Sequence, residues 1–249
     1  MQQSTARLDG KVALITGSGR GLGAGIALEL GKRGASVVVI YAHSASAADK
    51  VVAEIESFGS KAVAIQADVS KVPQVSNLFS QALSHFGRLD VVVSNSGTEI
   101  FRAEEDVTEE DYNHIFGLNM QAQFFVAQHV YRHVVSSGRI ILTSSVAAFM
   151  SDILNHALYA GSKAAVEGFA RSFAADCGHK GITVNAIAPG GIKTDMFAEN
   201  AWHYVPGAHP SWPADAIERG VANHGPLKRV GLPVDVARVV AFLAGPESE

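Results

Sequence analysis

The sequence predicts a doubly wound α/β fold, in which one parallel sheet is covered by helices on both faces. Three observations carry this prediction. Short β-branched runs alternate with helical patterns, the runs are apolar almost throughout, and no composition shift or internal repeat divides the 249 residues. Nearly continuous apolar runs are typical of strands that are buried on both faces. We therefore expect one domain over residues 1–249.

The predicted strands share a short run of apolar, mostly β-branched residues. They cover residues 11–16, 36–42, 61–67, 89–95, 138–144 and 182–188. Helical patterns lie between them, for example over residues 21–34 and 46–59. The acidic run over residues 103–112 predicts a helix start with Thr108 as its cap, because carboxylates favour a helix N-terminus.

Residues 190–234 interrupt the alternation. This insertion follows the last predicted strand, holds most of the prolines and both tryptophans, and shows no clear long helix. An insertion of this length usually forms a functional lid or binding loop. Ligands of open α/β sheets bind beyond the carboxyl ends of the strands, so we expect the insertion to bind substrate.

The end of the sequence departs from a complete sheet. A helix predicted over residues 235–244 should lead into a further parallel strand, yet the chain stops at GPESE. This C-terminal strand is therefore expected to be missing through truncation or a lost tail.

Composition excludes several classes of protein. Hydrophobic residues make up 47%, charged residues 18%, and the net charge is −4, which argues against disorder and against a nucleic-acid surface. No stretch approaches the ~20 apolar residues of a membrane span, and the N-terminus lacks a signal-peptide core. A single cysteine, Cys177, predicts a packed thiol in a reduced, cytoplasmic setting. His129 and His133 lack an acidic third ligand, so we expect surface histidines and no metal site.

A glycine-rich turn follows the first predicted strand, in TGSGRGLGAG (16–25). Gly17, Gly21 and Gly23 fit the pattern T-G-x-x-x-G-x-G, and an overlapping G-x-G-x-x-G/A pattern starts at Gly19. A backbone that approaches a pyrophosphate must lack side chains there, while the following helix supplies N–H donors and a favourable dipole. The turn predicts a Rossmann-type dinucleotide site.

The end of the second predicted strand favours NADPH. NAD-binding folds usually carry Asp or Glu there to hold the ribose 2′-hydroxyl. This strand ends without a carboxylate, at Tyr41, Ala42, His43 and Ser44. Arg20, inside the glycine turn, can face a 2′-phosphate. The alternative is that Arg20 is a solvated turn residue.

Tyr159 and Lys163 stand four apart in an Ala-rich, helix-favouring stretch, which puts both on one helix face. Reduction of a ketone by hydride requires a proton donor. A free phenol titrates near pH ~10, and a nearby ammonium lowers that pKa. Ser145, at the end of the fifth predicted strand, can hold the carbonyl oxygen. An amphipathic surface pair is the alternative, and the glycine turn and the serine argue against it.

These motifs resemble the short-chain dehydrogenases/reductases over essentially the whole chain. The resemblance rests on TGSGRGLG, SNSG (94–97), GLNM around Asn119, YAGSK and APGGIKT (188–194). SNSG departs from the usual NNAG but keeps the asparagine. The resemblance implies a catalytic tetrad of Asn119, Ser145, Tyr159 and Lys163, in which Asn119 anchors a proton-relay water.

The same resemblance implies the cofactor contacts and the assembly. The cofactor residues are Gly17, Arg20, Gly21, Leu22, Gly23, Tyr41, Ala42, His43, Ser44, Asp68, Val69, Asn95, Gly97, Tyr159, Lys163, Pro189, Gly190, Ile192 and Thr194. Family members usually associate through the helices that correspond to residues 112–135 and to the Tyr159 segment. We expect a homotetramer built from dimers, since both segments are apolar on more than one face.

Within the family, the chain is similar to fungal reductases of polyhydroxynaphthalenes, anthrols and versicolorin, and to a related 17β-hydroxysteroid dehydrogenase. The likeness rests on IYAHSASAADKVV, NHALY, APGGIKTDMF and GPLKRVGLPVDVARVVAFLA. It implies that Tyr204 lines the substrate pocket, whereas His224 stands where naphthol reductases tend to carry tryptophan. Aromatic and thioether side chains in and near the insertion suit a rigid ring system better than a flexible acyl chain. The candidate substrate residues are Ser145, Met150, Ile153, Tyr159, Gly191, Met196, Phe197, Trp202, Tyr204 and His224.

The expected function is therefore NADPH-dependent reduction of the keto tautomer of a fused-ring polyphenol, with Tyr159 as proton donor. Three alternatives remain open. Two are enzymes of the same family, a 17β-hydroxysteroid dehydrogenase and a 3-oxoacyl-thioester reductase. The third is a non-catalytic NADP(H) sensor, because a fold alone does not fix a function.

Overall fold

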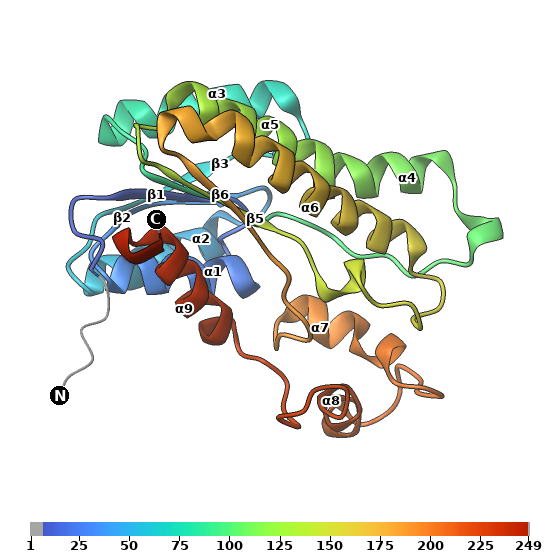
Figure 1. Ribbon diagram of the computed structural model, residues 1–249. Helices are drawn as coiled ribbons and strands as arrows, with labels where there is room; N and C mark the ends of the chain where they lie inside the picture. The colour runs from blue at the N-terminus through green and yellow to red at the C-terminus, as the bar shows by residue number, and fades with distance from the viewer. Residues whose placement is uncertain (1–6, 249) are drawn as a thin grey trace.

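The computed structural model describes residues 7–248, which form one parallel sheet between two layers of helices (Figure 1). The strand order is β3-β2-β1-β4-β5-β6. The strands are β1 (Val12–Ile15), β2 (Ser36–Tyr41), β3 (Ala62–Gln66), β4 (Val91–Ser94), β5 (Arg139–Thr143) and β6 (Thr183–Ile187). All six predicted strands are present within two residues of their predicted ends, which confirms the doubly wound fold.

Alternate residues of each strand enter different cores. Leu14 of β1 pairs with Val38 of β2 and Val92 of β4, and all three belong to one fully buried cluster. Its neighbours Ala13 and Ile15 belong to a second cluster on the opposite face. Both faces are therefore apolar, which is why the strands are continuous apolar runs. Each fully buried aliphatic side chain contributes about 1.5–3 kcal/mol.

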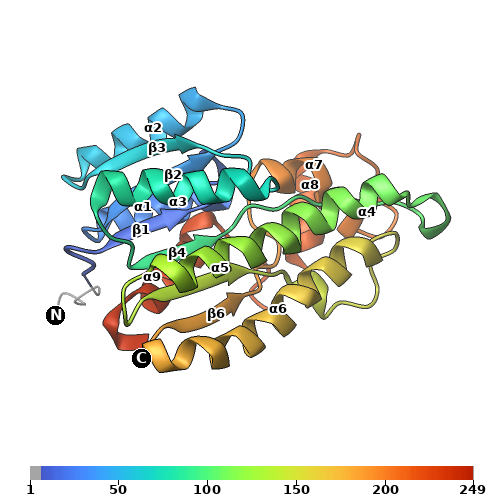
Figure 2. The ribbon, with the colours of Figure 1, turned by 90° about the horizontal axis from the view of Figure 1, so that it is seen from above.

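Helices cover both faces of the sheet (Figures 1 and 2). One layer holds α3 (Val72–Phe86), α5 (Ala122–His133) and α6 (Ala157–Cys177), and the other holds α1 (Gly21–Lys32), α2 (Ala45–Ser57) and α9 (Pro233–Ala244). The predicted helices over 21–34, 46–59 and 235–244 correspond to α1, α2 and α9.

The long predicted helical segment over 112–135 is interrupted by a π turn. α4 (Glu109–Phe116) passes through the π turn Gly117–Gln121 into α5. The start of α4 confirms the predicted cap: the Thr108 hydroxyl accepts a hydrogen bond from the Asp111 N–H, and the Asp111 carboxylate accepts one from the Thr108 N–H. Short π turns inside helices often occur at functional sites.

The insertion lies beyond the carboxyl ends of the strands (Figure 1). It contains only short helices, α7 (Asp195–Asn200), a 3-10 turn (Ala201–Tyr204) and α8 (Ala214–Ala222). A backbone hydrogen bond links the two ends of the insertion: the Lys193 N–H donates to the Gly231 carbonyl oxygen at 2.9 Å. The absence of a long helix is as predicted.

The described chain ends with α9 and a 3-10 turn, Pro246–Ser248, and between residues 7 and 248 no strand follows α9. The first residues, on which the signal-peptide expectation partly rests, lie outside the described part. Within the described part, no helix is both long and apolar enough to cross a bilayer.

One histidine expected at the surface is buried. His129 of α5 is 8% exposed and stacks on Phe79 of α3, with ring centroids 5.2 Å apart. The surface prediction is wrong for His129 because α5 packs on α3 along this face; His133 is exposed. Burial is the main cause that lowers the pKa of His129, and the nearby His133 and Arg132 lower it further. Residues 7–248 contain no cluster of three or more His, Cys, Asp or Glu side chains suited to a metal.

Cys177 is a free, buried thiol at the end of α6. Burial raises the pKa of this thiol to about 11, with Asp176 acting in the same direction. Because the thiolate is the nucleophile, this environment agrees with a packing role.

Candidate active site

The glycine turn after β1 adopts a backbone that side chains would obstruct. Gly17 and Gly21 have φ angles of 63° and 57°, in the left-handed region that favours glycine. A Cβ atom on Gly23 would lie 2.3 Å from the carbonyl oxygen of Gly17, which is closer than real contacts allow. The turn therefore keeps three positions bare where the strand passes into α1.

Hydrogen bonds tie this turn to the end of β4. The Thr16 hydroxyl accepts from the backbone N–H groups of Asn95 at 2.9 Å and Ser96 at 3.0 Å. The Asn95 side chain donates to the carbonyl oxygens of Thr16 at 3.1 Å and Gly17 at 3.4 Å. Asn95 thus joins β1 to β4 at the point where the strand order reverses, which is where such sheets bind ligands.

The N-terminus of α1 is ready to bind an anion. Arg20 occupies the cap position in an extended conformation, and its side chain makes no capping hydrogen bond. The first turn, Gly21-Leu22-Gly23, has no acidic residue. Uncapped N–H groups and the helix dipole favour a negative group at such a terminus. This bare cradle fits the pyrophosphate of a dinucleotide.

The end of β2 lies beside this cradle and presents no carboxylate. Tyr41 and Ala42 are half-buried, whereas His43 and Ser44 are exposed. The Ser44 hydroxyl caps α2, where it accepts a backbone N–H at 3.4 Å. An acidic ribose ligand of the NAD type is therefore absent from this described strand end.

Arg20 faces the insertion. Its side chain is 76% exposed, and its Nη1 lies 3.6 Å from Oδ2 of Asp195, the first residue of α7. An exposed ion pair of this kind contributes about 0–1 kcal/mol, so a phosphate can compete with Asp195 for Arg20.

Two further predicted cofactor residues follow β3. The Asp68 carboxylate accepts from the N–H and the hydroxyl of Ser70 at 3.0 and 2.6 Å, while Val69 is buried. Asp68 is thereby fixed at the edge of the sheet.

The chain leaves β6 toward the insertion at Pro189. The Pro189 carbonyl oxygen accepts the Val146 N–H at 3.1 Å, which joins this segment to the turn after β5. Gly190 is exposed. Thr194 donates to the carbonyl oxygen of Ile192 at 3.2 Å and caps α7. This segment, which holds four of the predicted cofactor residues, therefore lies between the β5 turn and the glycine turn.

Asn119 sits in the π turn and is fully buried. Its Nδ2 donates to the Thr98 carbonyl oxygen at 2.9 Å and to the Ser162 hydroxyl at 3.0 Å. Its Oδ1 accepts the Thr98 N–H at 2.8 Å. A Cβ on Gly97 would lie 3.1 Å from Asn119 Oδ1 and 3.2 Å from Lys163 Nζ. The backbone after β4 therefore passes between the asparagine and the lysine.

Lys163 is a buried ammonium. Its Nζ donates to the Thr143 carbonyl oxygen at 3.0 Å and lies 5.7 Å from the centre of the Tyr159 ring. Burial lowers the pKa of Lys163 to about 8, against the opposing effect of the Glu99 carboxylate. The lysine is thus mostly charged at neutral pH, although its pKa lies only slightly above neutral.

Tyr159 has a raised pKa, opposite to the sequence-based expectation. Burial is the main cause, the Glu99 carboxylate adds to it, and a hydrogen bond with Ser145 acts against it. The pKa of Tyr159 is therefore raised, not lowered as the Tyr159–Lys163 spacing predicts, because the cost of burying a phenolate is the largest influence on it. The Ser145 hydroxyl is buried and accepts the Ala147 N–H at 3.2 Å.

A polar cluster that the sequence did not predict lies beside the tetrad. We call Glu99, His156 and Tyr204 the Glu99 cluster. The Glu99 Oε1 accepts a short hydrogen bond from the Tyr204 hydroxyl and lies 3.0 Å from His156 Nε2. Side-chain exposure is 6% for Glu99 and 3% for His156. The cluster joins the loop after β4, the start of α6 and the insertion.

Aromatic rings continue from Tyr159 into the insertion. His156 stacks on Tyr159 with ring centroids 4.7 Å apart, and Phe101 stacks on His156 at 4.3 Å. His203 then stacks on Phe101 at 3.8 Å, and Trp202 on His203 at 3.5 Å. We call these five rings the aromatic stack. The Tyr204 ring stands edge-on to Phe101 and His156, each at 5.5 Å.

The remaining predicted substrate residues are more dispersed. Met150 and Ile153 are half-buried, and Met196 is 38% exposed. Phe197 lies against Gly191, where an added Cβ would come within 3.4 Å of its ring.

Two aromatic residues of the insertion differ in their links to this region. His224 is exposed, and its Nε2 lies 2.8 Å from the Tyr204 carbonyl oxygen. Trp212 is 43% exposed and has no ring contact among the described residues.

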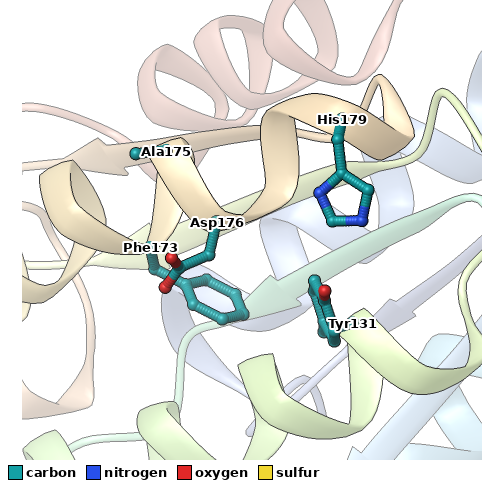
Figure 3. Close-up of a pocket in the computed structure, with 5 residues that line it drawn as sticks. All are labelled: Tyr131, Phe173, Ala175, Asp176 and His179. Atoms are coloured by element: carbon teal, nitrogen blue, oxygen red, sulfur yellow. The ribbon is translucent and has the colours of Figure 1, made fainter.

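A depression of about 510 Å³ lies elsewhere, between α5 and α6 (Figure 3). It is lined by Tyr131, Phe173, Ala175, Asp176 and His179. Phe173 and Tyr159 lie at opposite ends of α6, and a helix rises about 1.5 Å per residue, so some 20 Å separates them. This depression is not part of the active site.

Comparisons with known proteins agree with this site. The family model described as short chain dehydrogenase matches residues 11–204. A hydroxynaphthalene reductase-like protein of Metarhizium acridum is 66% identical over 242 residues, which cover 97% of this chain and 91% of the relative. Tetrahydroxynaphthalene reductase of Pestalotiopsis fici is 60% identical over 240 residues, which cover 96% and 87%.

A solved structure extends the match to three dimensions. The short chain dehydrogenase from Burkholderia cenocepacia J2315, solved in complex with NADP, has a TM-score of 0.87 at 38% identity. The alignment covers 97% of this chain and 93% of that chain. From its fold, its site residues and these matches, the chain belongs to the short-chain dehydrogenase/reductase family and is a nicotinamide-dependent oxidoreductase.

Proposed function

We propose that the protein is an NADPH-dependent reductase of the keto tautomer of a fused-ring polyphenol, such as a hydroxynaphthalene or an anthrol. One observation carries the proposal: the buried Tyr159 phenol forms one end of the aromatic stack, which reaches into the insertion. The names of the relatives from Metarhizium acridum and Pestalotiopsis fici support the naphthol class.

The residues along the carboxyl edge fit the proposed cofactor. The bare glycine turn and the N-terminus of α1 would hold the pyrophosphate, and Arg20, with His43 and Ser44, would hold a 2′-phosphate. When bound, the reduced nicotinamide supplies the hydride. The other proposed contacts are Asp68 and Val69 for the adenine, Asn95 and Gly97 along the edge, and Ile192 and Thr194 for the nicotinamide amide, with Pro189 and Gly190 beside them.

The proton comes from Tyr159 in this proposal. Hydride addition to a ketone leaves negative charge on the oxygen, which Ser145 would hold by a hydrogen bond while Tyr159 protonates it. The buried charge of Lys163 stabilises the phenolate left behind and can also bind the cofactor ribose. Asn119 keeps the loop after β4 in place and can anchor a water that returns a proton.

The raised pKa of Tyr159 supports the role of proton donor that reduction requires. Burial and Glu99 keep the phenol protonated at neutral pH, which is the state that donates a proton. Oxidation of an alcohol would need the phenolate.

The aromatic stack supports a flat, mostly apolar substrate. Rings interact best with other rings in offset or edge-to-face contacts, which add about 0.5–1.5 kcal/mol beyond burial. A steroid fits an apolar slot without such contacts, and the basic residues of the insertion are scattered, which does not favour an acidic acyl-carrier protein. Retention of both Tyr159 and Lys163 argues against a non-catalytic sensor.

The assembly that we propose is a homotetramer that uses α5 and α6. The Phe124 ring of α5 is 39% exposed and lies 5.2 Å from Phe169 of α6, which lies 5.0 Å from Phe173. A row of partly exposed aromatic rings on two neighbouring helices is typical of a protein interface.

Tyr159→Phe should abolish turnover of hydroxynaphthalenes and leave NADPH binding nearly unchanged, because only the proton-donating hydroxyl is removed. Lys163→Ala should damage both, since the ammonium serves the phenolate and the ribose. Steady-state kinetics and fluorescence titration with NADPH measure the two effects. Reduction by the Phe variant above a few per cent of the wild-type rate would contradict the assignment.

NADPH should be preferred over NADH by at least about tenfold, or roughly 1.4 kcal/mol. Arg20→Ala should narrow this preference by weakening NADPH binding alone. Asp195→Ala is the matched control: it removes the partner of Arg20 and should not weaken NADPH binding. Equal kcat/KM for the two cofactors in the wild-type protein would refute the cofactor assignment.

Phe124→Glu should convert the tetramer into smaller species, because it places a charge in the proposed apolar contact. Phe58→Glu, at a similarly exposed ring at the end of α2, should leave the assembly intact. Light scattering at micromolar concentration reports both. A monomeric wild-type protein, or an effect of Phe58→Glu equal to that of Phe124→Glu, would argue against this interface.

A further inference from the structure

Glu99 is a buried carboxylate with an incomplete set of partners. It lies in the loop that follows β4, and its side chain is 6% exposed. Its Oε1 receives both contacts of the Glu99 cluster, from Tyr204 and His156. Within residues 7–248, its Oε2 has no hydrogen bond and no ion pair, and the only basic side chain within salt-bridge distance of the carboxylate is His156, which is charged only if protonated.

Such an arrangement carries a desolvation cost for the carboxylate as a whole, although Oε2 is not among the buried polar atoms that lack a partner and so keeps some contact with solvent. Removing a carboxylate from water is unfavourable unless its oxygens are paired, and each ionised oxygen can accept more than one hydrogen bond. An apolar side chain of similar size would avoid this cost in a region that already contains a stack of rings. A group retained at such a cost next to catalytic residues is a candidate for function.

The position of Glu99 relative to the chemistry limits what that function can be. His156 touches Glu99 at 3.0 Å and stacks on Tyr159 at 4.7 Å, so the carboxylate lies one side chain away from the proton donor. Tyr204 brings the insertion to the same oxygen. A substrate whose ketone meets Tyr159 and Ser145 would therefore bind within about one side chain of Glu99, whose Oε2 makes no hydrogen bond within the described residues.

We propose that Glu99 is a specificity-determining residue: its carboxylate accepts a hydrogen bond from a hydroxyl group on the substrate ring and so selects hydroxylated ketones over unsubstituted ones. A phenolic hydroxyl is a strong donor to an ionised carboxylate, and such charge-assisted bonds are stronger than neutral ones. A site built to bond a hydroxyl rejects analogues that lack it, because the acceptor then stays unpaired. This inference rests on the proposed function, since it concerns which ring ketone that reductase prefers.

Glu99 could instead serve only to fasten Tyr204 and the insertion. Tyr204→Phe separates the two roles, because it removes the hydroxyl that bonds Glu99 and leaves both the ring and the carboxylate. If Glu99 only fastens Tyr204, then Tyr204→Phe and Glu99→Gln lower kcat/KM by similar factors for every substrate. If Glu99 recognises the substrate, only Glu99→Gln lowers kcat/KM more for hydroxylated ketones than for unsubstituted ones.

The test compares 2-tetralone, a bicyclic ketone without hydroxyl groups, with a series of 2-tetralones that each carry one hydroxyl at a different ring position. We expect Glu99→Gln to lower kcat/KM at least tenfold more for one or more hydroxytetralones than for 2-tetralone, mainly through KM. Tyr204→Phe should change both kinds of substrate by similar factors. Glu99→Gln removes the charge but keeps one amide oxygen as an acceptor, whereas Glu99→Leu removes the acceptor altogether. Thermal unfolding checks that each variant is folded.

Equal losses on all tetralones, within threefold, in both Glu99→Gln and Glu99→Leu would overturn the inference. Failure of the proposed function gives a different result, namely no reduction of any hydroxynaphthalene by the wild-type protein. In that case, kcat/KM for the hydroxytetralones relative to that for 2-tetralone still reports on Glu99, so the two outcomes are distinguishable.

Discussion

The buried amide of Asn119 is the constraint on which the active site depends. Its three hydrogen bonds, to the Thr98 backbone and to the Ser162 hydroxyl, join the loop after β4, the α4–α5 helix and α6. The π turn makes room for this side chain inside what would otherwise be a regular helix. Because the backbone at Gly97 passes between Asn119 and Lys163, the asparagine also fixes the path of the loop that presents Glu99.

Burial gives the site its acid–base properties. Lys163 and Tyr159 lie at 3% and 7% exposure, and burial disfavours the charged form of each. The two pKa values therefore move toward the neutral forms, with that of Lys163 falling to about 8 and that of Tyr159 rising. The phenol stays protonated and the ammonium stays charged at neutral pH. Active sites commonly accept such buried polar groups at a cost in stability.

The fold could be predicted because its cause is local in the sequence. Each strand is buried on both faces, so each appears as an apolar run, and the six runs were placed within two residues of their ends. The Tyr159–Lys163 pair was found for a similar reason: its spacing is one helical turn. The Glu99 cluster could not be found this way, because its contacts join residues 57 and 105 positions apart. Spacing also says nothing about desolvation, which is why the pKa of Tyr159 and the burial of His129 were predicted wrongly.

We infer that burial, more than the nearby Lys163 ammonium, sets the protonation state of Tyr159. Ultraviolet absorbance of tyrosinate, followed against pH in the wild-type protein and in Tyr159→Phe, measures this directly as a difference between two titrations. We expect the difference to show no tyrosinate from Tyr159 below about pH 10, the value of a free phenol. A Tyr159 titration with its midpoint near neutral pH would contradict the claim.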